Sequence, residues 1–329
     1  ASVSIPATVT TIGDYAFYKS GLRSMAVPAK VTALPNGLCH SCLNLETVSY
    51  SVSAVTSIGS TAFYKCEKLQ ALAIGEKVRT IGSSMCRGCK TLASISIPSS
   101  VTSIGDAAFQ ECSKLTKLDL NTPFLGTSHS FIEKVFGTAA RAIITEVTLG
   151  TSVTGINDNT FEACTGVTEV VIPGSVKTIG KSAFQGCTAL KSATIPEGTQ
   201  SVGEKAFYGC GSMTDLSISK TVTTIGPSAF MECNKLTNLY MDTPIVKSST
   251  HFSTNSFSTA ALSGIKTLEV GANVDTIGVA AFYKLTGLSS LTLPNGLLEI
   301  KSSAFSLCSA LASVSIPATV TTIGDYAFY

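Results

Sequence analysis

The sequence predicts a repeat solenoid in which each coil of about 23 residues supplies one parallel β-strand. The first observation is a period: the residues that end the apolar, strand-like runs follow one another in steps of 22 to 24 residues, with two steps of 29. The second is the coil's length, because a crossover between parallel strands needs about a dozen residues or more. The series predicts thirteen complete coils between the residues Ile5, Val27, Tyr50, Ile74, Ile97, Leu120, Leu149, Ile172, Ile195, Ile218, Met241, Val270, Leu293 and Ile316.

The coil at 97–120 shows what each part of the unit is expected to form. Leu118 belongs to an alternation of apolar and polar residues that is typical of a strand with one buried face. Gly105 follows an apolar residue and is expected to permit a turn with a positive φ. Phe109 and Cys112 lie at short helical spacing, which predicts a brief helical or 3-10 turn on the convex side.

Two coils, 121–149 and 242–270, are longer than the others by six residues. They start 121 residues apart, which equals four ordinary coils and one long coil, so a five-coil repeat lies above the basic one. The segment FIEKVFGTAARAI (131–143) predicts a helix within the first long coil. The Ser/Thr-rich counterpart in the second long coil is a weaker helix former.

The first eighteen residues, 1–18, are identical to residues 312–329. Because the other coils diverge from one another, this identity indicates a recent duplication or a long unit that begins again. We expect one solenoid over 1–329 that is a segment of a longer array or is capped by another copy, since uncapped solenoid ends expose their core. The candidate residues for an end-to-end contact are Ile5, Val9, Ile12, Phe17, Ile316, Val320, Ile323 and Phe328.

Composition excludes several classes of partner. Charged residues make up 13% of the chain, and its net charge of +2 is spread without a basic run. Nucleic-acid binding, which relies on clustered positive charge, therefore has no support. No apolar run reaches the roughly 18 residues that a membrane-spanning helix needs, so we expect no membrane span in this chain.

Cysteine spacing suggests one alternative, a zinc site made by Cys39-x-x-Cys42 and Cys86-x-x-Cys89. The repeat argues against it, because the two pairs lie two coils apart, or roughly 10 Å at the usual strand spacing. Same-slot cysteines of successive coils point the same way, which does not suit the converging geometry of a disulfide. We therefore expect buried free thiols that act as small hydrophobic residues, and neither a metal nor a cofactor.

The sequence contains no arrangement that points to catalysis: no Ser-His-Asp set, no paired carboxylates at a defined spacing, no P-loop and no GxGxxG. A binding function would use the outward strand positions, which form a small, polar stripe. Among the residue types that dominate binding energies, only Tyr240 occurs on this stripe. The candidate interaction residues are Tyr240, Lys117, Asp119, Glu169, Lys191, Asp215, Asn238, Lys266 and, in the two long coils, His129 and His251.

The unit I-P-x-x-V-T-x-I-G-x-x-A-F-x-x-C-x-x-L-x-x-L-x-I resembles the BspA-like, or treponemal-type, leucine-rich repeats along the whole chain. The long coils depart from that pattern, and Cys39 and Cys86 replace its Phe. The resemblance implies a right-handed leucine-rich-repeat horseshoe or superhelix with a parallel sheet on its concave side. It also implies surface or secreted proteins of bacteria and protists that often adhere to host or matrix proteins, without shared catalytic residues. The family slots are filled, in one coil, by Pro98, Val101, Ile104, Gly105, Ala108, Phe109, Cys112 and Leu115.

Two functions follow as expectations. The first is a non-enzymatic cell-surface or secreted protein that mediates protein–protein interaction or adhesion, with a host or matrix protein as its partner. The second is a structural protein whose copies stack end to end into an extracellular fibre or sheath. Both place the chain outside the cell or at its surface, and neither requires a cofactor or nucleic acid.

Overall fold

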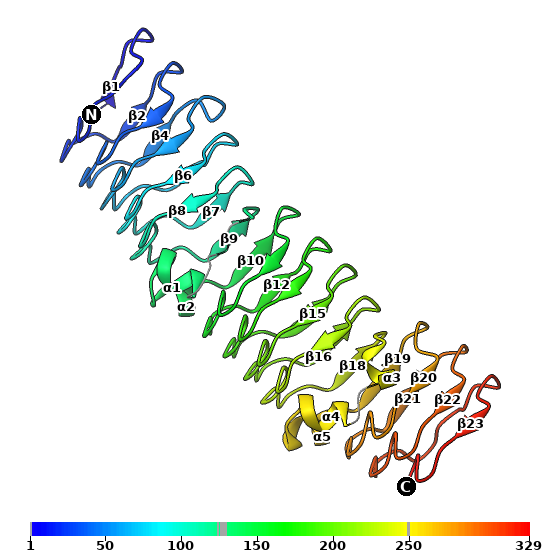
Figure 1. Ribbon diagram of the computed structural model, residues 1–329. Coiled ribbons are helices and arrows are strands. Elements are labelled where there is room, and N and C mark those ends of the chain that lie inside the picture. Colours follow the sequence, from blue (N-terminus) through cyan, green and yellow to red (C-terminus); the bar gives the residue numbers. More distant parts are fainter. Residues whose placement is uncertain (1, 124, 126–129, 249–250) are drawn as a thin grey trace. The chain divides into compact units, whose positions relative to one another are not determined.

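The computed structural model describes residues 2–123, 125, 130–248 and 251–329. The chain divides into two compact units, Ala1–Val153 and Thr154–Tyr329. Each unit is a stack of coils in which neighbouring strands pair in parallel (Figure 1). The predicted solenoid of parallel strands is confirmed, whereas its continuity over the whole chain stays a prediction.

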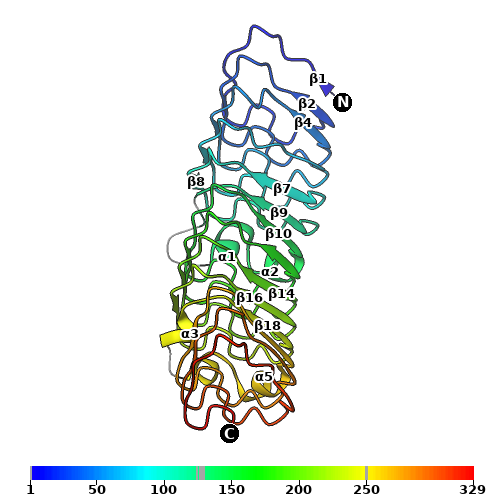
Figure 2. The same cartoon turned by 90° about the vertical axis from the view of Figure 1, so that its right-hand side faces the viewer.

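The long strands of the first unit form where the apolar runs predict them, with one exception. An isolated bridge between Thr47 and Ala71 takes the place of the strand expected before Ile74. Figure 2 shows β7, β9 and β10 on one side of the coils and the short strand β8 on another. The long strands pair as β1 (Ser2–Val3), β2 (Ser24–Ala26) and β4 (Thr47–Ser49), and as β7 (Ser94–Ile97), β9 (Lys117–Leu120) and β10 (Glu146–Leu149).

The second unit repeats this arrangement. Its long strands bury alternate residues, as β14 does with Ala193 and Ile195, because successive side chains of a strand point to opposite faces. The strand expected before Ile316 does not form. The long strands of this unit are β12 (Glu169–Val171), followed by the paired series β14 (Ser192–Ile195), β16 (Asp215–Ile218), β18 (Asn238–Met241), β19 (Thr267–Val270) and β21 (Ser290–Thr292).

Most ordinary coils add a second strand of two residues, which the sequence did not predict, at the V-T-x-I segment. Its final residue points inward, as Ile179 does, and its β-branched residues suit strand geometry. In the first unit these strands are β3 (Ala33–Leu34), β5 (Ser57–Ile58), β6 (Thr80–Ile81) and β8 (Ser103–Ile104). In the second they are β11 (Gly155–Ile156), β13 (Thr178–Ile179), β15 (Ser201–Val202), β17 (Thr224–Ile225), β20 (Thr276–Ile277), β22 (Glu299–Ile300) and β23 (Thr322–Ile323).

The turn prediction for Gly105 is wrong. Gly105 does not have a positive φ; it is required because a Cβ atom there would overlap the backbone nitrogen of Ser83 in the preceding coil. The left-handed conformation occurs instead at Ala107 (φ 57°) and Glu111 (φ 63°). These residues divide the expected helical stretch into separate turns, one of which is closed by the Gln110 N–H donating to the Ala107 carbonyl at 3.1 Å.

The core of the second unit contains a ladder of stacked Phe rings. The centroids of Phe184 and Phe207 lie 5.0 Å apart, and those of Phe207 and Phe230 lie 5.6 Å apart. The eleven cysteines are buried and free, as predicted. The structure adds a reason for the residue type, because the Cys210 thiol donates to the carbonyl oxygen of Phe184 at 3.3 Å, and other coils repeat this bond. A buried carbonyl thereby gains a donor that Ala or Val could not supply.

The long coils contain the helices. The predicted helix at 131–143 is confirmed as α1 (Phe131–Phe136) and α2 (Ala140–Ile143), and Ser130 caps α1 by accepting from the Glu133 N–H at 3.3 Å. The second long coil has more helix than its Ser/Thr-rich sequence predicts. It forms α3 (Ile245–Ser248), α4 (Phe252–Ser256) and α5 (Thr259–Gly264).

Candidate binding face

The long-strand sheet β14-β16-β18-β19-β21 presents a regular outward face. Parallel pairing without a register shift aligns the outward residues in two rows, while Leu216, Leu239 and Leu268 are buried beneath them. We call the ten outward residues the binding face. Its first row is Ser192, Asp215, Asn238, Thr267 and Ser290, and its second row is Thr194, Ser217, Tyr240, Glu269 and Thr292.

A groove of about 300 Å³ lies on this face. It is lined by Asp215, Asn238, Tyr240 and Glu269, together with the hydroxyl side chains of the first four strands. Tyr240 is half-buried and is the aromatic residue among the lining residues. The groove therefore combines one aromatic ring with carboxylate, amide and hydroxyl groups.

The two carboxylates of the groove differ in their partners. Asp215 accepts from the side-chain amide of Asn238 at 2.7 Å and from the Thr214 hydroxyl at 2.6 Å. Glu269 is exposed and pairs in register with Tyr240, and its carboxylate has no hydrogen bond or ion pair within the part of the chain that the structure describes. Burial and the charges of Asp242 and Glu269 raise the pKa of Tyr240, so the phenol is neutral near pH 7 and can donate.

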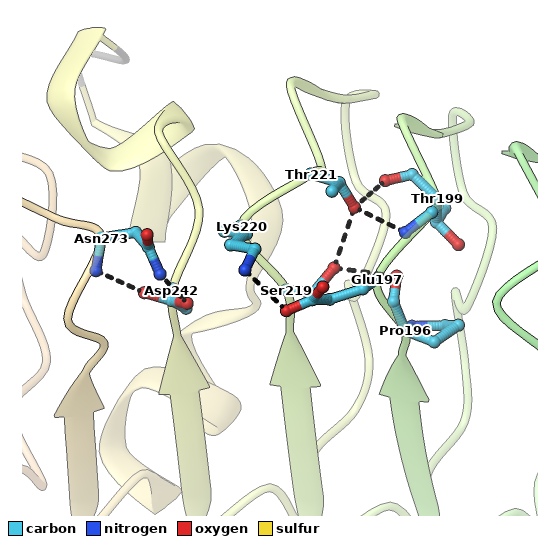
Figure 3. A network of polar contacts seen from close by, with 9 residues as sticks. Pro196, Glu197, Thr199, Ser219, Lys220, Thr221, Asp242 and Asn273 are labelled. Carbon is cyan, nitrogen blue, oxygen red and sulfur yellow. Dashed lines mark hydrogen bonds and ion pairs between the residues drawn. The ribbon is translucent and has the colours of Figure 1, made fainter.

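Asp242 fixes the rim of the groove where β18 ends (Figure 3). Its carboxylate accepts from the backbone N–H of Asn273 at 2.9 Å and from the Asn273 side-chain amide at 2.7 Å. Gly271 leaves the space for this carboxylate, since a Cβ atom there would overlap Asp242. Asp242 is not among the residues predicted from the sequence, although its place directly after the strand indicates such a capping role.

Hydroxyl groups continue this rim past the ends of β14 and β16 (Figure 3). Ser219 donates to the Pro196 carbonyl at 2.8 Å, and Thr221 donates to the Thr199 carbonyl at 2.8 Å. Lys220 pairs with Glu197 at 2.9 Å, and this contact raises the pKa of Lys220. The rim is therefore a hydrogen-bonded network that links successive coils, and its lysine, Lys220, is paired with Glu197 within the rim.

The corresponding face of the first unit pairs its charges internally. Lys117 forms an ion pair with Glu146 at 2.8 Å, and Asp119 accepts from the Ser96 hydroxyl at 3.0 Å. These two candidate interaction residues are thus already engaged by neighbouring strands.

The other predicted interaction residues are distributed as follows. Glu169 and Lys191 are exposed, at the first residue of β12 and just before β14. The Lys266 ammonium donates to the Ser263 carbonyl at 3.2 Å. His251 has a φ of 58° before α4 and its ring lies 5.8 Å from that of Tyr283, whereas His129 lies outside the described residues. The groove thus brings together Asp215, Asn238 and Tyr240 of the predicted set, and adds Glu269.

The end-coil residues are less buried than their counterparts in inner coils. Ile323 is 52% exposed and Phe328 is 37% exposed, whereas Ile277 and Phe282 are fully buried. The remaining candidates for end-to-end contact are half-buried, namely Ile5, Val9, Ile12, Phe17, Ile316 and Val320.

Among the residues with described positions, no group of three or more His, Cys, Asp or Glu is placed to hold a metal ion. Every helix in the described segments is too short or too polar to cross a lipid bilayer.

Parallel coils of about 23 residues with an apolar ladder inside define a leucine-rich-repeat protein. The chain belongs to the family of the BspA type leucine rich repeat region, whose sequence profile matches residues 1–116, 154–266 and 250–329 in 6 copies. The resemblance seen in the repeat is thereby confirmed. No curated protein matches the chain in sequence.

Three solved structures illustrate the similarity. A leucine-rich repeat protein from Bacteroides ovatus has 21% identity and a TM-score of 0.49, with 98% of this chain and 82% of that chain covered. A leucine-rich repeat protein from Eubacterium ventriosum has 22% identity and a TM-score of 0.40, with 93% and 82% covered. A leucine rich cell surface protein from Faecalibacterium prausnitzii has 24% identity and a TM-score of 0.31, with 72% and 86% covered.

Proposed function

We propose that this chain is a non-enzymatic leucine-rich-repeat protein that binds a protein partner through the binding face of its second unit. The observation that carries this proposal is the groove, in which Tyr240 lies among Asp215, Asn238 and Glu269 on a face otherwise made of hydroxyl residues. The buried ladder and the bonded rim hold this face in one shape, so binding needs little ordering of the backbone.

The composition of the face suits a protein partner. Tyr is one of the residue types that dominate the energy of protein interfaces, especially where polar residues surround it. The hydroxyl rows offer donors and acceptors at the strand spacing of about 4.8 Å, and protein interfaces use roughly one hydrogen bond per 100–200 Å². The groove would be the anchor of a larger contact, since stable interfaces bury about 800 Å² on each partner.

We place this activity outside the cell or at its surface, and its wider form is adhesion to a host or matrix protein. The support is membership of the BspA-type family, for which the repeat unit implies such a role. Immunostaining of intact cells that carry the full gene tests the location, and protein found only in the interior contradicts it.

The binding proposal is tested by comparing two Tyr variants in the second unit. Tyr240→Ala removes the ring from the groove, whereas Tyr208→Ala removes a half-buried Tyr that follows the core residue Phe207 and is not on the binding face. Against a partner captured from a panel of matrix proteins, surface plasmon resonance should show at least a tenfold loss for Tyr240→Ala and little change for Tyr208→Ala. Equal affinities for the two variants, or no partner at all, would contradict the proposal.

A second candidate is the stacking of copies through the first and last coils. It is supported by the exposure of Ile323 and Phe328, which occupy core slots, and by the identity of residues 1–18 and 312–329. The competing arrangement is that further coils of a longer chain cover these residues. Electron microscopy of the isolated chain at high concentration should show filaments that Phe328→Glu abolishes, and dispersed particles in both samples would contradict stacking.

A further inference from the structure

We propose that the partner inserts an arginine side chain into the groove, where its guanidinium lies against Tyr240 and pairs with Glu269. This inference rests on the proposed function and adds the chemistry of the partner. It begins with charge: the ten residues of the binding face include two carboxylates, Asp215 and Glu269, and no Lys, Arg or His. A face of this kind attracts a cationic group and repels acidic ones.

Three lysines of the second unit lie close to the binding face in the sequence, and none of them forms an ion pair with Glu269 among the described residues; Lys191 is exposed just before β14. Lys220 on the rim pairs with Glu197 at 2.9 Å, and Lys266 donates to the Ser263 carbonyl at 3.2 Å. The Glu269 carboxylate has no hydrogen bond or ion pair in the part of the chain that the structure describes. The groove therefore presents, directly beside its aromatic ring, a carboxylate that no lysine or arginine pairs with among the described residues.

The register places these two groups where one ligand can contact both. Tyr240 and Glu269 are directly paired on the adjacent strands β18 and β19, about 4.8 Å apart at the usual strand spacing, and both point outward. A planar guanidinium can stack on an aromatic ring and donate two hydrogen bonds to a carboxylate in its own plane. Asp215 already accepts two hydrogen bonds, so its contribution is a negative potential across the groove.

Arginine fits this geometry better than lysine. An ammonium is a compact, strongly hydrated charge, whereas a guanidinium is more weakly hydrated and presents a flat fork. A half-buried ring beside one free carboxylate favours the flat group, because it can contact both with less loss of hydration. A neutral or acidic glycan would leave Glu269 unmatched.

The experiment uses four labelled peptides that alternate Gly with Arg, Lys, Gln or Glu, with binding to the full chain measured by fluorescence anisotropy. We expect the Arg peptide to bind at least fivefold more tightly than the Lys peptide, and the Gln and Glu peptides not to bind. Glu269→Gln should weaken the Arg peptide about tenfold and reduce the preference for Arg over Lys. The control Glu232→Gln removes an exposed carboxylate away from the groove and should have little effect.

The outcomes separate this inference from the proposed function. Because Glu269 is exposed and has no partner among the described residues, Glu269→Gln should leave the thermal midpoint unchanged, so a loss of binding would not reflect unfolding. Equal binding of the Arg peptide to wild type and Glu269→Gln, or equal losses for Glu269→Gln and Glu232→Gln, would overturn the inference. If the affinity of a captured protein partner depends on Tyr240 but not on Glu269, the proposed function stands and the inference of an inserted arginine is wrong. A captured glycan would overturn both.

Discussion

Truncation of Phe207 tests how the ring ladder stabilises the second unit. Phe207 is 1% exposed and its ring stacks between those of Phe184, at 5.0 Å, and Phe230, at 5.6 Å. Replacement of a buried Phe by Ala costs about 3–5 kcal/mol, and each stacked pair adds about 0.5–1.5 kcal/mol beyond burial. We therefore expect Phe207→Ala to lower the free energy of unfolding by at least about 4 kcal/mol.

Phe282→Ala is the matched control in the same unit. Phe282 is fully buried but stacks on one ring, that of Phe305, at 5.5 Å. Urea unfolding followed by circular dichroism measures both variants, because the free energy of unfolding falls linearly with denaturant. Phe207→Ala should cost about 0.5–1.5 kcal/mol more than Phe282→Ala, which is one stacked pair. Equal costs, or a cost below about 1 kcal/mol for either variant, would refute the account of the ladder.

Two further predictions concern the spacing of coils and the buried thiols. Gly203→Ala places a Cβ atom 2.6 Å from backbone atoms of Gly180 and Lys181, and should lower the free energy of unfolding in urea by about 1–3 kcal/mol. The control Gly211→Ala, whose Cβ atom would lie 3.9 Å from its nearest neighbour, should lower it by less than about 1 kcal/mol. Equal costs for the two variants would contradict the role of Gly203 in the close approach of coils. Burial raises the pKa of Cys308 to about 11 and that of Cys187 well above its usual range. Because unfolded thiols titrate near about 8.5, the folded state holds extra protons on these two thiols above that pH. Their contribution to stability should be constant below about pH 8 and fall as the pH rises towards 11. Thiols that react with Ellman's reagent in the native protein at pH 8 would contradict their burial.

The period of the sequence was sufficient to predict the coils, because a fixed spacing of apolar residues directly reports which positions face the core. The second strand and the left-handed residues were not predictable in this way. Ala107 and Glu111 carry no side-chain signal for a positive φ. At Ala107 the backbone N–H donates to the Lys134 carbonyl of the next coil at 2.7 Å, a contact that the sequence does not reveal. Gly105 was misinterpreted because the contact that requires glycine comes from Ser83, in a different coil.

The candidate site was predicted in part for a related reason. Alternation in the strands identifies outward residues, so Asp215, Asn238 and Tyr240 were found from the sequence. Whether an outward charge is available depends on its neighbours in the adjacent strands, which is why Lys117 was included although Glu146 neutralises it. Glu269 is also an outward position of this alternation, in the same row as Tyr240, but it was not chosen as a candidate because the sequence does not show that its carboxylate lacks a side-chain partner.

Hydrogen exchange of the chain with and without a bound Arg peptide tests the central claim most directly. We expect slower exchange in the second unit at 192–194, 215–217, 238–240 and 267–269, with the largest change next to Tyr240 and Glu269, because these segments line the groove. The equivalent strands of the first unit, 94–97 and 117–120, should not change. Protection of those strands instead, or protection confined to the turns opposite the long-strand sheet, would contradict the assignment of the binding face.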